Sequence, residues 1–466
     1  MSRLVIASNR VALPDGQTAG GLAVALAEAL EARGGIWFGW SGRTRKNPPV
    51  EARIIRHGKV DYALTDLDPV DQQAHYAGYA NSTLWPLCHY RLGLVDARRS
   101  DWEAYRRVNR VFARSLVPLL RPDDIVWVHD YHLIPLGAEL RALGFAGRIG
   151  YFHHIPFPVP SVFCALAEHR ALMRDFSHYD LVGLQTREDL AAFIDYVRDE
   201  EGGTVEAGER ISAFGRTYRV KAFPIAIDAR QVAADARAAV GTPDWISLSD
   251  SLVGRKLIIG VDRLDYSKGI PNKIDAFRIL LERYPDHVRA VSFMQIAPLS
   301  RNEVSSYRAL RREIEAAAGR LNGTYSAPDW VPLRYLNSAF DRASLAGMYR
   351  LARVGLVTPF RDGMNLVAKE FVAAQDPEDP GVLVLSRFAG AARELDGAFL
   401  VNPYDRDIIA DAIHLSLVMS LEERRERWRR MWQAICDKTA LGWTDLYIAD
   451  LTGEPPAAIE VPAAAT

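Results

Sequence analysis

The chain has 466 residues, which is too long for one ordinary domain and predicts two or three. Its 49% hydrophobic and 25% charged residues are typical of a globular protein, and a net charge of −1 argues against a nucleic-acid or membrane-surface protein. No apolar run reaches the length of a membrane span, and the three cysteines show no metal-like spacing. We therefore expect a cytoplasmic protein without disulfides.

Short apolar runs alternate with longer helical patterns almost throughout. In the first half, strands are predicted at residues 4–8, 125–129, 149–152 and 181–184, and helices at 21–31, 102–120, 133–143 and 187–197. A second series follows Ala226, with strands at 256–261, 288–296, 354–357 and 382–386. This alternation predicts an α/β protein with parallel sheets and crossover helices, and a domain junction near Ala226.

Arg10 directly follows the first predicted strand, and Gly20-Gly21 opens the first helix. Ligands of open α/β sheets bind at the carboxyl ends of the strands, so Arg10 is well placed to hold an anion. A surface arginine in a loop fits the same position equally well. A dinucleotide site lacks its fingerprint, because the sequence contains no Gly-x-Gly-x-x-Gly.

Aromatic and histidine residues supply further candidates in the first half. Trp40, Tyr76 and Trp85 are aromatics near predicted turns that are able to cover the C–H face of a sugar, although an isolated tryptophan is more often a core residue. The strand-end histidines and Asp130 do not have the spacing of a metal site, so no metal is expected. Asp130 and His154 are better suited to bind sugar hydroxyls, whereas a structural role is the simpler interpretation of His129, His132 and His153.

Cations follow two predicted strands of the second half. Arg263 and Lys268 follow the strand at 256–261, where a planar fork and a point charge are able to neutralise a diphosphate. The alternative is that both are paired with Asp262 and Asp265. Another cation, Arg301, follows the strand at 288–296, and this recurrence favours a functional site.

The most informative run is residues 361–370, RDGMNLVAKE, between a predicted buried strand and a helix. Gly363 lies at the strand-to-helix turn, where free N–H groups and the helix dipole attract phosphate. Asp362 and Glu370 bracket the turn, and carboxylates bind sugar hydroxyl pairs. The run therefore suits a sugar nucleotide, although a capped turn with solvent-facing acids explains it slightly better when the run is considered alone.

Together these motifs resemble the trehalose-6-phosphate synthase family of retaining glycosyltransferases. The resemblance runs from Leu4 to about Leu451. It is carried by Ser8-Asn9-Arg10, Gly20-Gly21-Leu22, Trp85-Pro86-Leu87, His129 to Leu133, Val261 to Gly269, Arg361 to Glu370 and Ser386 to Ala392. It implies the GT-B fold, in which two Rossmann-like doubly wound parallel-sheet domains have the active site in the cleft between them.

The resemblance implies that glucose moves from a nucleoside diphosphate glucose, with UDP the commonest nucleotide, to glucose 6-phosphate. It also implies a role for each candidate residue. Donor-site residues would be Gly21, His154, Arg263, Lys268, Asp362, Gly363, Met364, Asn365, Leu366, Val367 and Glu370, and acceptor-site residues would be Arg10, Trp40, Tyr76, Trp85, Asp130 and Arg301. Among them Arg263, Lys268, Asp130, His154 and Asp362 would be catalytic.

In such an enzyme the leaving phosphate oxygen takes the acceptor's proton during front-face attack. The protein stabilises the charge that builds on the diphosphate, so neither a metal nor a cofactor is expected. The implied domains are an acceptor domain at 1–226, a nucleotide-sugar domain at 227–439, a helix at about 440–452 that packs back on the first domain, and a flexible tail at 453–466. The expected partners are small-molecule substrates and further copies of the chain in a dimer or tetramer.

Three rival functions fit the sequence less well. A glucosylglycerol-phosphate synthase would use a smaller acceptor, and the aromatics with Arg10 and Arg301 favour glucose 6-phosphate instead. A nucleotide-sugar epimerase would not need a second phosphate clamp. A catalytically silent homologue is disfavoured by the intact cations and carboxylates of the second half.

Overall fold

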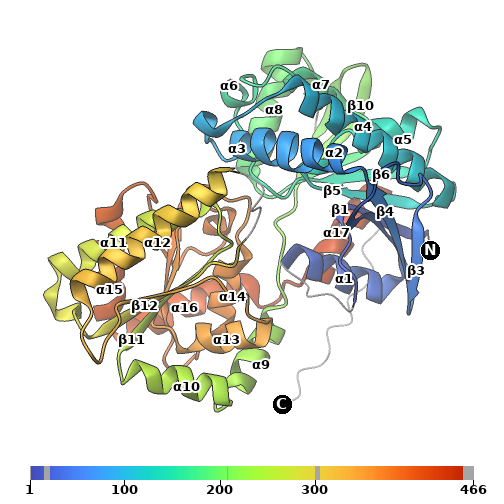
Figure 1. Ribbon diagram of the computed structural model, residues 1–466. Coiled ribbons are helices and arrows are strands. Elements are labelled where there is room, and N and C mark those ends of the chain that lie inside the picture. The colour runs from blue at the N-terminus through green and yellow to red at the C-terminus, as the bar shows by residue number, and fades with distance from the viewer. Residues whose placement is uncertain (1, 15–20, 207, 300–304, 455–466) are drawn as a thin grey trace. The chain divides into compact units, whose positions relative to one another are not determined.

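The computed structural model describes residues 2–14, 21–206, 208–299 and 305–454. The chain divides into two compact units. Unit 1 comprises Met1–Ile225 together with Ala440–Thr466, and unit 2 comprises Ala226–Thr439. Figure 1 labels the helices and strands of both units.

In the described part of unit 1, ten strands form one sheet in the order β3-β4-β2-β1-β5-β6-β7-β10-β9-β8. The central pairs from β4 to β10 are parallel, and the outer pairs β3/β4, β10/β9 and β9/β8 are antiparallel. The strands are β1 Leu4–Arg10, β2 Gly35–Thr44, β3 Arg53–His57, β4 Val60–Leu67, β5 Ile125–His129, β6 Arg148–Phe152, β7 Leu181–Leu184, β8 Thr204–Glu206, β9 Arg210–Ala213 and β10 Arg216–Ala222.

Helices cover both faces of this sheet, with α1 and α17 on one side and α4 and α5 on the other (Figure 1). The buried faces of β1 and β5 consist of residues such as Val5, Ile6 and Val126, which are fully enclosed. The helices are α1 Gly21–Arg33, α2 Pro69–Gln72, α3 Trp85–Cys88, α4 Arg99–Leu116, α5 Leu136–Ala142, α6 Pro160–Phe163, α7 His169–Phe176, α8 Arg187–Glu201 and α17 Ala440–Thr452, with a π-helical segment at Gln73–Leu84.

Helix α17 joins unit 1 although the chain reaches it only after unit 2. Its Tyr447 is fully buried and donates its hydroxyl to the carbonyl oxygens of Tyr151 and Leu181, at 3.0 and 2.9 Å. Gly150 and Gly183 make room for the Tyr447 ring, since a Cβ at either position would lie within 2.9 Å of it. Small residues on β6 and β7 and one large residue on α17 therefore fix the position of this helix.

Unit 2 contains a sheet of six parallel strands, among its described residues, in the order β13-β12-β11-β14-β15-β16. Helices α11, α12 and α15 pack on one face and α9, α13, α14 and α16 on the other (Figure 1). The strands are β11 Lys256–Val261, β12 Val291–Ile296, β13 Leu333–Leu336, β14 Val354–Val357, β15 Val382–Ser386 and β16 Phe399–Val401. The helices are α9 Ala229–Ala239, α10 Pro243–Leu252, α11 Ile270–Arg283, α12 Ser305–Tyr325, α13 Arg342–Leu351, α14 Leu366–Ala374, α15 Arg406–Val418 and α16 Leu421–Ile435.

Several boundaries differ from the sequence prediction. The helix predicted at 133–143 begins at Leu136, because residues 131–133 form a tight 3₁₀ turn and Pro135 occupies the cap. The strand predicted at 288–296 begins at Val291, after Arg289 in a left-handed conformation (φ 65°). Trp40, which is predicted to lie near a turn, lies within β2.

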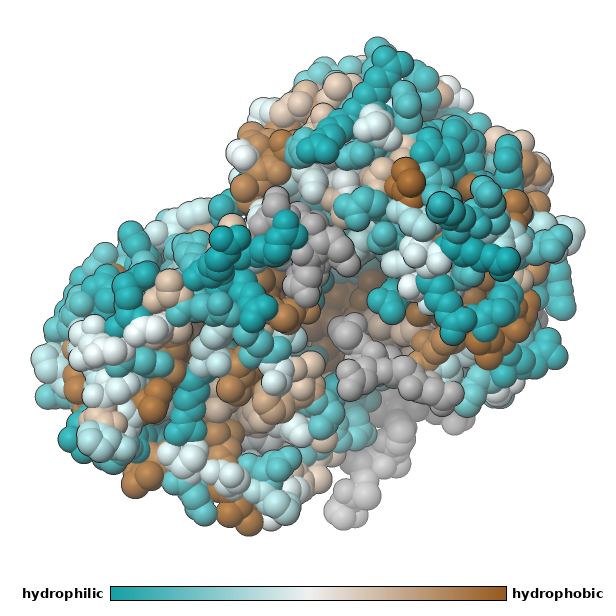
Figure 2. All heavy atoms as spheres, viewed as in Figure 1, coloured by the Kyte–Doolittle hydropathy of each residue, from teal (hydrophilic) through white to brown (hydrophobic). Residues whose placement is uncertain are grey.

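No helix in the described part of the chain is long and apolar enough to cross a membrane. On the face seen in Figure 2, hydrophobic residues lie among hydrophilic ones over both units. Exposed apolar residues such as Val70 and Leu446 are normal features of a protein surface.

Candidate functional site

Each sheet reverses its strand order at one place, and there the loops leave the carboxyl edge in opposite directions. In unit 1 the reversal lies between β1 and β5, and in unit 2 between β11 and β14. Open α/β sheets bind ligands outside the strand ends at such points. Arg10 ends β1 and Asp130 follows β5, whereas Arg263 follows β11 and Asp362 follows β14.

In unit 2 the structure brings Lys268, Asp362 and Asn365 together. The Lys268 ammonium lies 2.5 Å from Oδ2 of Asp362, and both side chains are more than four-fifths buried. The Asn365 amide donates to the same Oδ2 at 3.0 Å. The alternative interpretation of the sequence, in which Lys268 pairs with Asp262 or Asp265, is therefore wrong for Lys268. Asp262 instead binds Lys273, and Asp265 accepts hydrogen bonds from Ser267 N and the Tyr307 hydroxyl.

The backbone of the turn into α14 leaves room for a ligand beside the first N–H groups of the helix. Asn365 caps the helix from a left-handed conformation (φ 80°), and its side chain accepts from Ala368 N at 3.1 Å. The helix therefore begins at Leu366, three residues after Gly363, where the sequence predicted the turn. Leu366 and Val367 occupy the first helical positions, whose N–H groups have no partner within a helix and favour an anion.

The loop before α14 is locked to the segment that follows β15. Gly390 N donates to Asp362 O, and Ala391 N donates to Met364 O at 2.8 Å. A Cβ at Gly390 would lie 2.0 Å from the Gly363 carbonyl oxygen, so only glycine permits this contact. Asp362, Gly363 and Met364 thus have one fixed backbone path.

Glu370 lies one turn into α14. The residue is half-buried, and burial raises the pKa of Glu370, an effect that Arg342 opposes. Solvent-facing acids on both sides of the turn, the simpler interpretation of the sequence, are therefore wrong, because Asp362 is ion-paired and Glu370 is half-buried. Arg263 is an exposed residue just beyond β11.

In unit 1 Arg10 and Trp40 lie side by side on adjacent strands. The Arg10 guanidinium carbon is 5.8 Å from the Trp40 ring centroid, and Gly42 (φ 85°) leaves the space that this guanidinium occupies. Tyr76 lies 6.4 Å from Trp40, ring centroid to centroid. Trp85 differs from these, because it is 5% exposed and packs against His89 and Tyr131.

Asp130 and His154 meet at the ends of β5 and β6. Asp130 adopts φ 75°, a conformation that costs a residue other than glycine about 1–3 kcal/mol and that is common at functional sites. Its Oδ1 accepts from His154 N at 3.3 Å. Burial, followed by the nearby His129 and His153, holds the pKa of His154 well below its usual value, so the imidazole is neutral.

The remaining strand-end histidines are buried in the interior of unit 1. Burial lowers the pKa of His129 and of His153 to about 3 in each case. His132 is buried and stacks on Tyr76 at 5.7 Å. Among the described residues no group of three or more His, Cys, Asp or Glu is placed to hold a metal ion.

Two predicted residues, Gly20 and Arg301, lie outside the described residues, as do 455–466 of the predicted tail. Gly21 opens α1 and is half-buried.

Comparison with known protein families finds one matching family. The model of glycosyltransferase family 20 matches residues 8–453, which is nearly the whole chain. The chain belongs to glycosyltransferase family 20. It is an enzyme of the GT-B fold, with the two α/β units described above.

Relatives of this family 20 enzyme are similar over their full length. The trehalose-6-phosphate synthase of Sinorhizobium fredii (strain NBRC 101917 / NGR234) is 50% identical, with 97% of this chain and 98% of the relative covered. A crystal structure of the UDP-forming α,α-trehalose-phosphate synthase from Burkholderia xenovorans in complex with glucose-6-phosphate is 46% identical, with a TM-score of 0.94 over 97% of this chain and 100% of that one. An E. coli structure bound with UDP-2-fluoro glucose is 45% identical, with a TM-score of 0.92 over 98% and 100% of the two chains.

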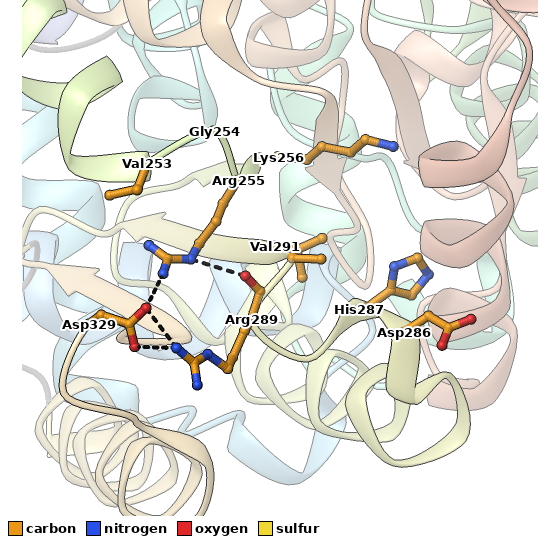
Figure 3. A pocket seen from close by; sticks show the side chains of 10 residues that line it. Val253, Gly254, Arg255, Lys256, Asp286, His287, Arg289, Val291 and Asp329 are labelled. Carbon is orange, nitrogen blue, oxygen red and sulfur yellow. Dashed lines mark hydrogen bonds and ion pairs between the residues drawn. The ribbon is translucent and has the colours of Figure 1, made fainter.

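A separate pocket of the family 20 enzyme lies at the opposite edge of the unit 2 sheet. It has a volume of about 610 Å³ and lies at the amino ends of β11 and β12. Arg255 and Arg289 both bind Asp329 there, at 2.7–2.8 Å (Figure 3). Lys256 donates to Leu417 O at 2.7 Å. These cations join neighbouring loops, and the pocket contains none of the predicted site residues.

Two polar residues of the family 20 enzyme escaped the sequence analysis. Lys273 lies on the first turn of α11 and Gln185 follows β7, and both are almost completely buried. The position of Gln185 directly after a predicted strand is the one sequence feature that points to it. No sequence feature points to Lys273, because a lysine near a helix start is normally solvated.

Proposed function

We propose that this family 20 enzyme transfers glucose from UDP-glucose to glucose 6-phosphate, forming α,α-trehalose 6-phosphate and UDP. The observation that carries the proposal is the Lys268–Asp362–Asn365 cluster beside the N-terminus of α14, at the strand-order reversal of unit 2. It combines a cation and helix N–H groups for phosphate with a carboxylate for sugar hydroxyls. The names of the relatives give the reaction its substrates.

In this proposal unit 2 holds the donor. Arg263, Lys268 and the N–H groups of Leu366 and Val367 neutralise the diphosphate. The diphosphate competes with Asp362 for the Lys268 ammonium, and the released Asp362 carboxylate binds donor hydroxyls together with the Gly363-Met364-Asn365 backbone. Glu370 accepts from the ribose hydroxyls. From unit 1, Gly21 and His154 also contact the donor.

Residues of unit 1 hold the acceptor in this proposal. Arg10 binds the phosphate of glucose 6-phosphate, with Arg301 of unit 2 as a second ligand. Trp40, Tyr76 and Trp85 shape the acceptor site, with Trp85 acting from the buried layer beneath it. Asp130 lies between the two sugars. This aromatic group favours a hexose phosphate over glycerol 3-phosphate, the acceptor of the nearest rival reaction.

The chemistry follows from these roles. The acceptor hydroxyl attacks the anomeric carbon from the face that the diphosphate leaves, and its proton passes to the departing phosphate oxygen. Arg263 and Lys268 stabilise the negative charge that builds on the diphosphate, which is electrostatic preorganisation. The step requires no metal or other cofactor. Three free thiols suit the reducing cytoplasm, and we also propose a homo-oligomer.

The test is substrate discrimination by Arg10→Ala. Losing a charge-assisted hydrogen bond removes roughly 1.5–3 kcal/mol of interaction free energy with the acceptor phosphate. The value of kcat/KM for glucose 6-phosphate should therefore fall about 10- to 150-fold. UDP-glucose affinity, measured by calorimetry, should change little. The matched control is Arg53→Ala, which removes an exposed arginine from the edge strand β3.

The wild-type enzyme should form trehalose 6-phosphate, and a panel of UDP-, GDP- and ADP-glucose fixes the donor base. Equal losses with glucose and glucose 6-phosphate in Arg10→Ala would remove Arg10 from the phosphate site. Absence of product with every donor would overturn the proposed reaction itself.

A further inference from the structure

His154 belongs to a chain of hydrogen bonds that runs through the interior of unit 1. Ile225 N lies 3.1 Å from Oε1 of Gln185. The Nε2 atom of Gln185 lies 3.3 Å from Nδ1 of His154, and Nε2 of His154 lies 3.0 Å from Nδ1 of His129. Gln185 and His129 are each 1% exposed.

The direction of every bond in this chain can be worked out from one backbone group. The N–H of Ile225 only donates, so the facing Gln185 atom is its carbonyl oxygen and the amide cannot be flipped. The Gln185 NH₂ group therefore donates to Nδ1 of His154. A neutral imidazole carries one proton, which must then be on Nε2, and this N–H donates to Nδ1 of His129.

The neutral state of His154 has a physical cause, because burial holds its pKa well below the usual value. The same logic places the proton of His129 on its Nε2. That atom is buried and has no hydrogen-bond partner among the described residues. With the opposite tautomer of either histidine, two donors or two acceptors would face each other in this series of hydrogen bonds.

We propose that Gln185 is a positioning residue that fixes His154 as the Nε2–H tautomer, so that His154 presents a hydrogen-bond donor to a hydroxyl of the donor sugar. This inference rests on the proposed function, which places His154 beside that sugar. A sugar hydroxyl oxygen accepts from Nε2–H in competition with His129. The hydroxyl proton remains available for another acceptor.

The Gln185 amide also connects the site to the segment that leaves unit 1. Ile225 is the last residue of unit 1 before the chain enters unit 2 at Ala226. Two residues earlier, Phe223 O accepts from the indole nitrogen of Trp443 at 3.0 Å. The His154 imidazole is therefore held by a backbone whose path is itself fixed from α17.

The decisive measurement is long-range ¹H–¹⁵N NMR on the full chain labelled at histidine, with His154→Asn and His129→Asn used for assignment. The wild-type spectrum should show the His154 proton on Nε2. In Gln185→Glu the carboxylate still accepts from Ile225 N but cannot donate, so the proton should move to Nδ1. Gln73→Glu, an exposed glutamine of unit 1, is the matched control and should leave His154 unchanged.

Kinetics connect the tautomer to the reaction. Gln185→Glu should raise the KM for UDP-glucose roughly 2- to 10-fold, the value of one hydrogen bond, with little change in KM for glucose 6-phosphate. If Gln185→Glu does not fold, Gln185→Met removes the donor without adding charge, and the His154 signals should then show both tautomers.

A wild-type proton on Nδ1, or an unchanged tautomer in Gln185→Glu, would overturn the positioning role. A shifted tautomer with unchanged KM for UDP-glucose would overturn the contact between His154 and the sugar. If the proposed function itself were wrong, the wild-type enzyme would form no trehalose 6-phosphate. Both results above are distinct from that outcome.

Discussion

The buried pair Lys273–Asp262 supports the loop that carries Arg263 and Lys268. The two charged atoms lie 2.5 Å apart, and the side chains are 0% and 1% exposed. Lys273→Met removes the ammonium and leaves the Asp262 carboxylate buried, with the Gln295 amide still 3.1 Å away. Breaking a buried pair from one side costs about 3–5 kcal/mol, so we expect unit 2 to lose that much stability.

This loss is large because a domain's total stability is only about 5–15 kcal/mol. Hydrogen exchange followed by mass spectrometry on peptides of β11 and α11 measures it within unit 2, without assuming that the two units unfold together. The control is Arg278→Met, which breaks a pair with Glu282 whose side chains are 41% and 50% exposed. An exposed pair of this kind contributes about 0.2–1 kcal/mol.

The double variant Asp262→Asn/Lys273→Met tests the reason for the loss. It removes both charges and keeps an acceptor for Gln295, so it should recover at least about 2 kcal/mol of the single variant's loss. The reasoning is refuted if Lys273→Met costs no more than Arg278→Met, or if the double variant is less stable than the single one.

Three further predictions concern the substitution of Glu370, the stability of the enzyme at low pH and its activity without metal ions. Burial raises the pKa of Glu370, so the folded enzyme holds the Glu370 proton more tightly than the unfolded chain does. The free energy of unfolding therefore decreases as pH rises through the folded pKa. Glu370→Gln should raise Tm at pH 7 and weaken UDP-glucose binding, which calorimetry measures. Burial lowers the pKa of His75 to about 4, and the pKa of His129 and of His153 to about 3. The unfolded chain therefore binds protons first as pH drops below about 6.5, and the free energy of unfolding should fall by about 1.4 kcal/mol per pH unit for each histidine. Urea titrations measure this loss. Transferase activity should survive EDTA, and a loss that magnesium or zinc restores would contradict charge neutralisation by Arg263 and Lys268.

The sequence by itself determined the architecture and the identity of the candidate residues. Buried parallel strands are continuous apolar runs, so β1, β5, β11 and β14 were visible in the pattern. The strand β3 was not, because as an edge strand it is exposed on both faces and carries no apolar alternation. Strand ends also located Arg10, Asp130, Arg263 and Asp362, since ligands of such sheets bind there.

Only the tertiary structure decided how those side chains are partnered. The sequence allowed Lys268 to pair with an acid of its own loop, but β11 and β14 are neighbours in the sheet, and this brings Asp362 to it from 94 residues away. The same holds for the tautomer of His154, which depends on Gln185 and His129 from other strand ends. Apolar patterns record which face of an element is buried, but hydrogen-bond partners depend on contacts between distant elements, and one chain's residue order does not encode them locally.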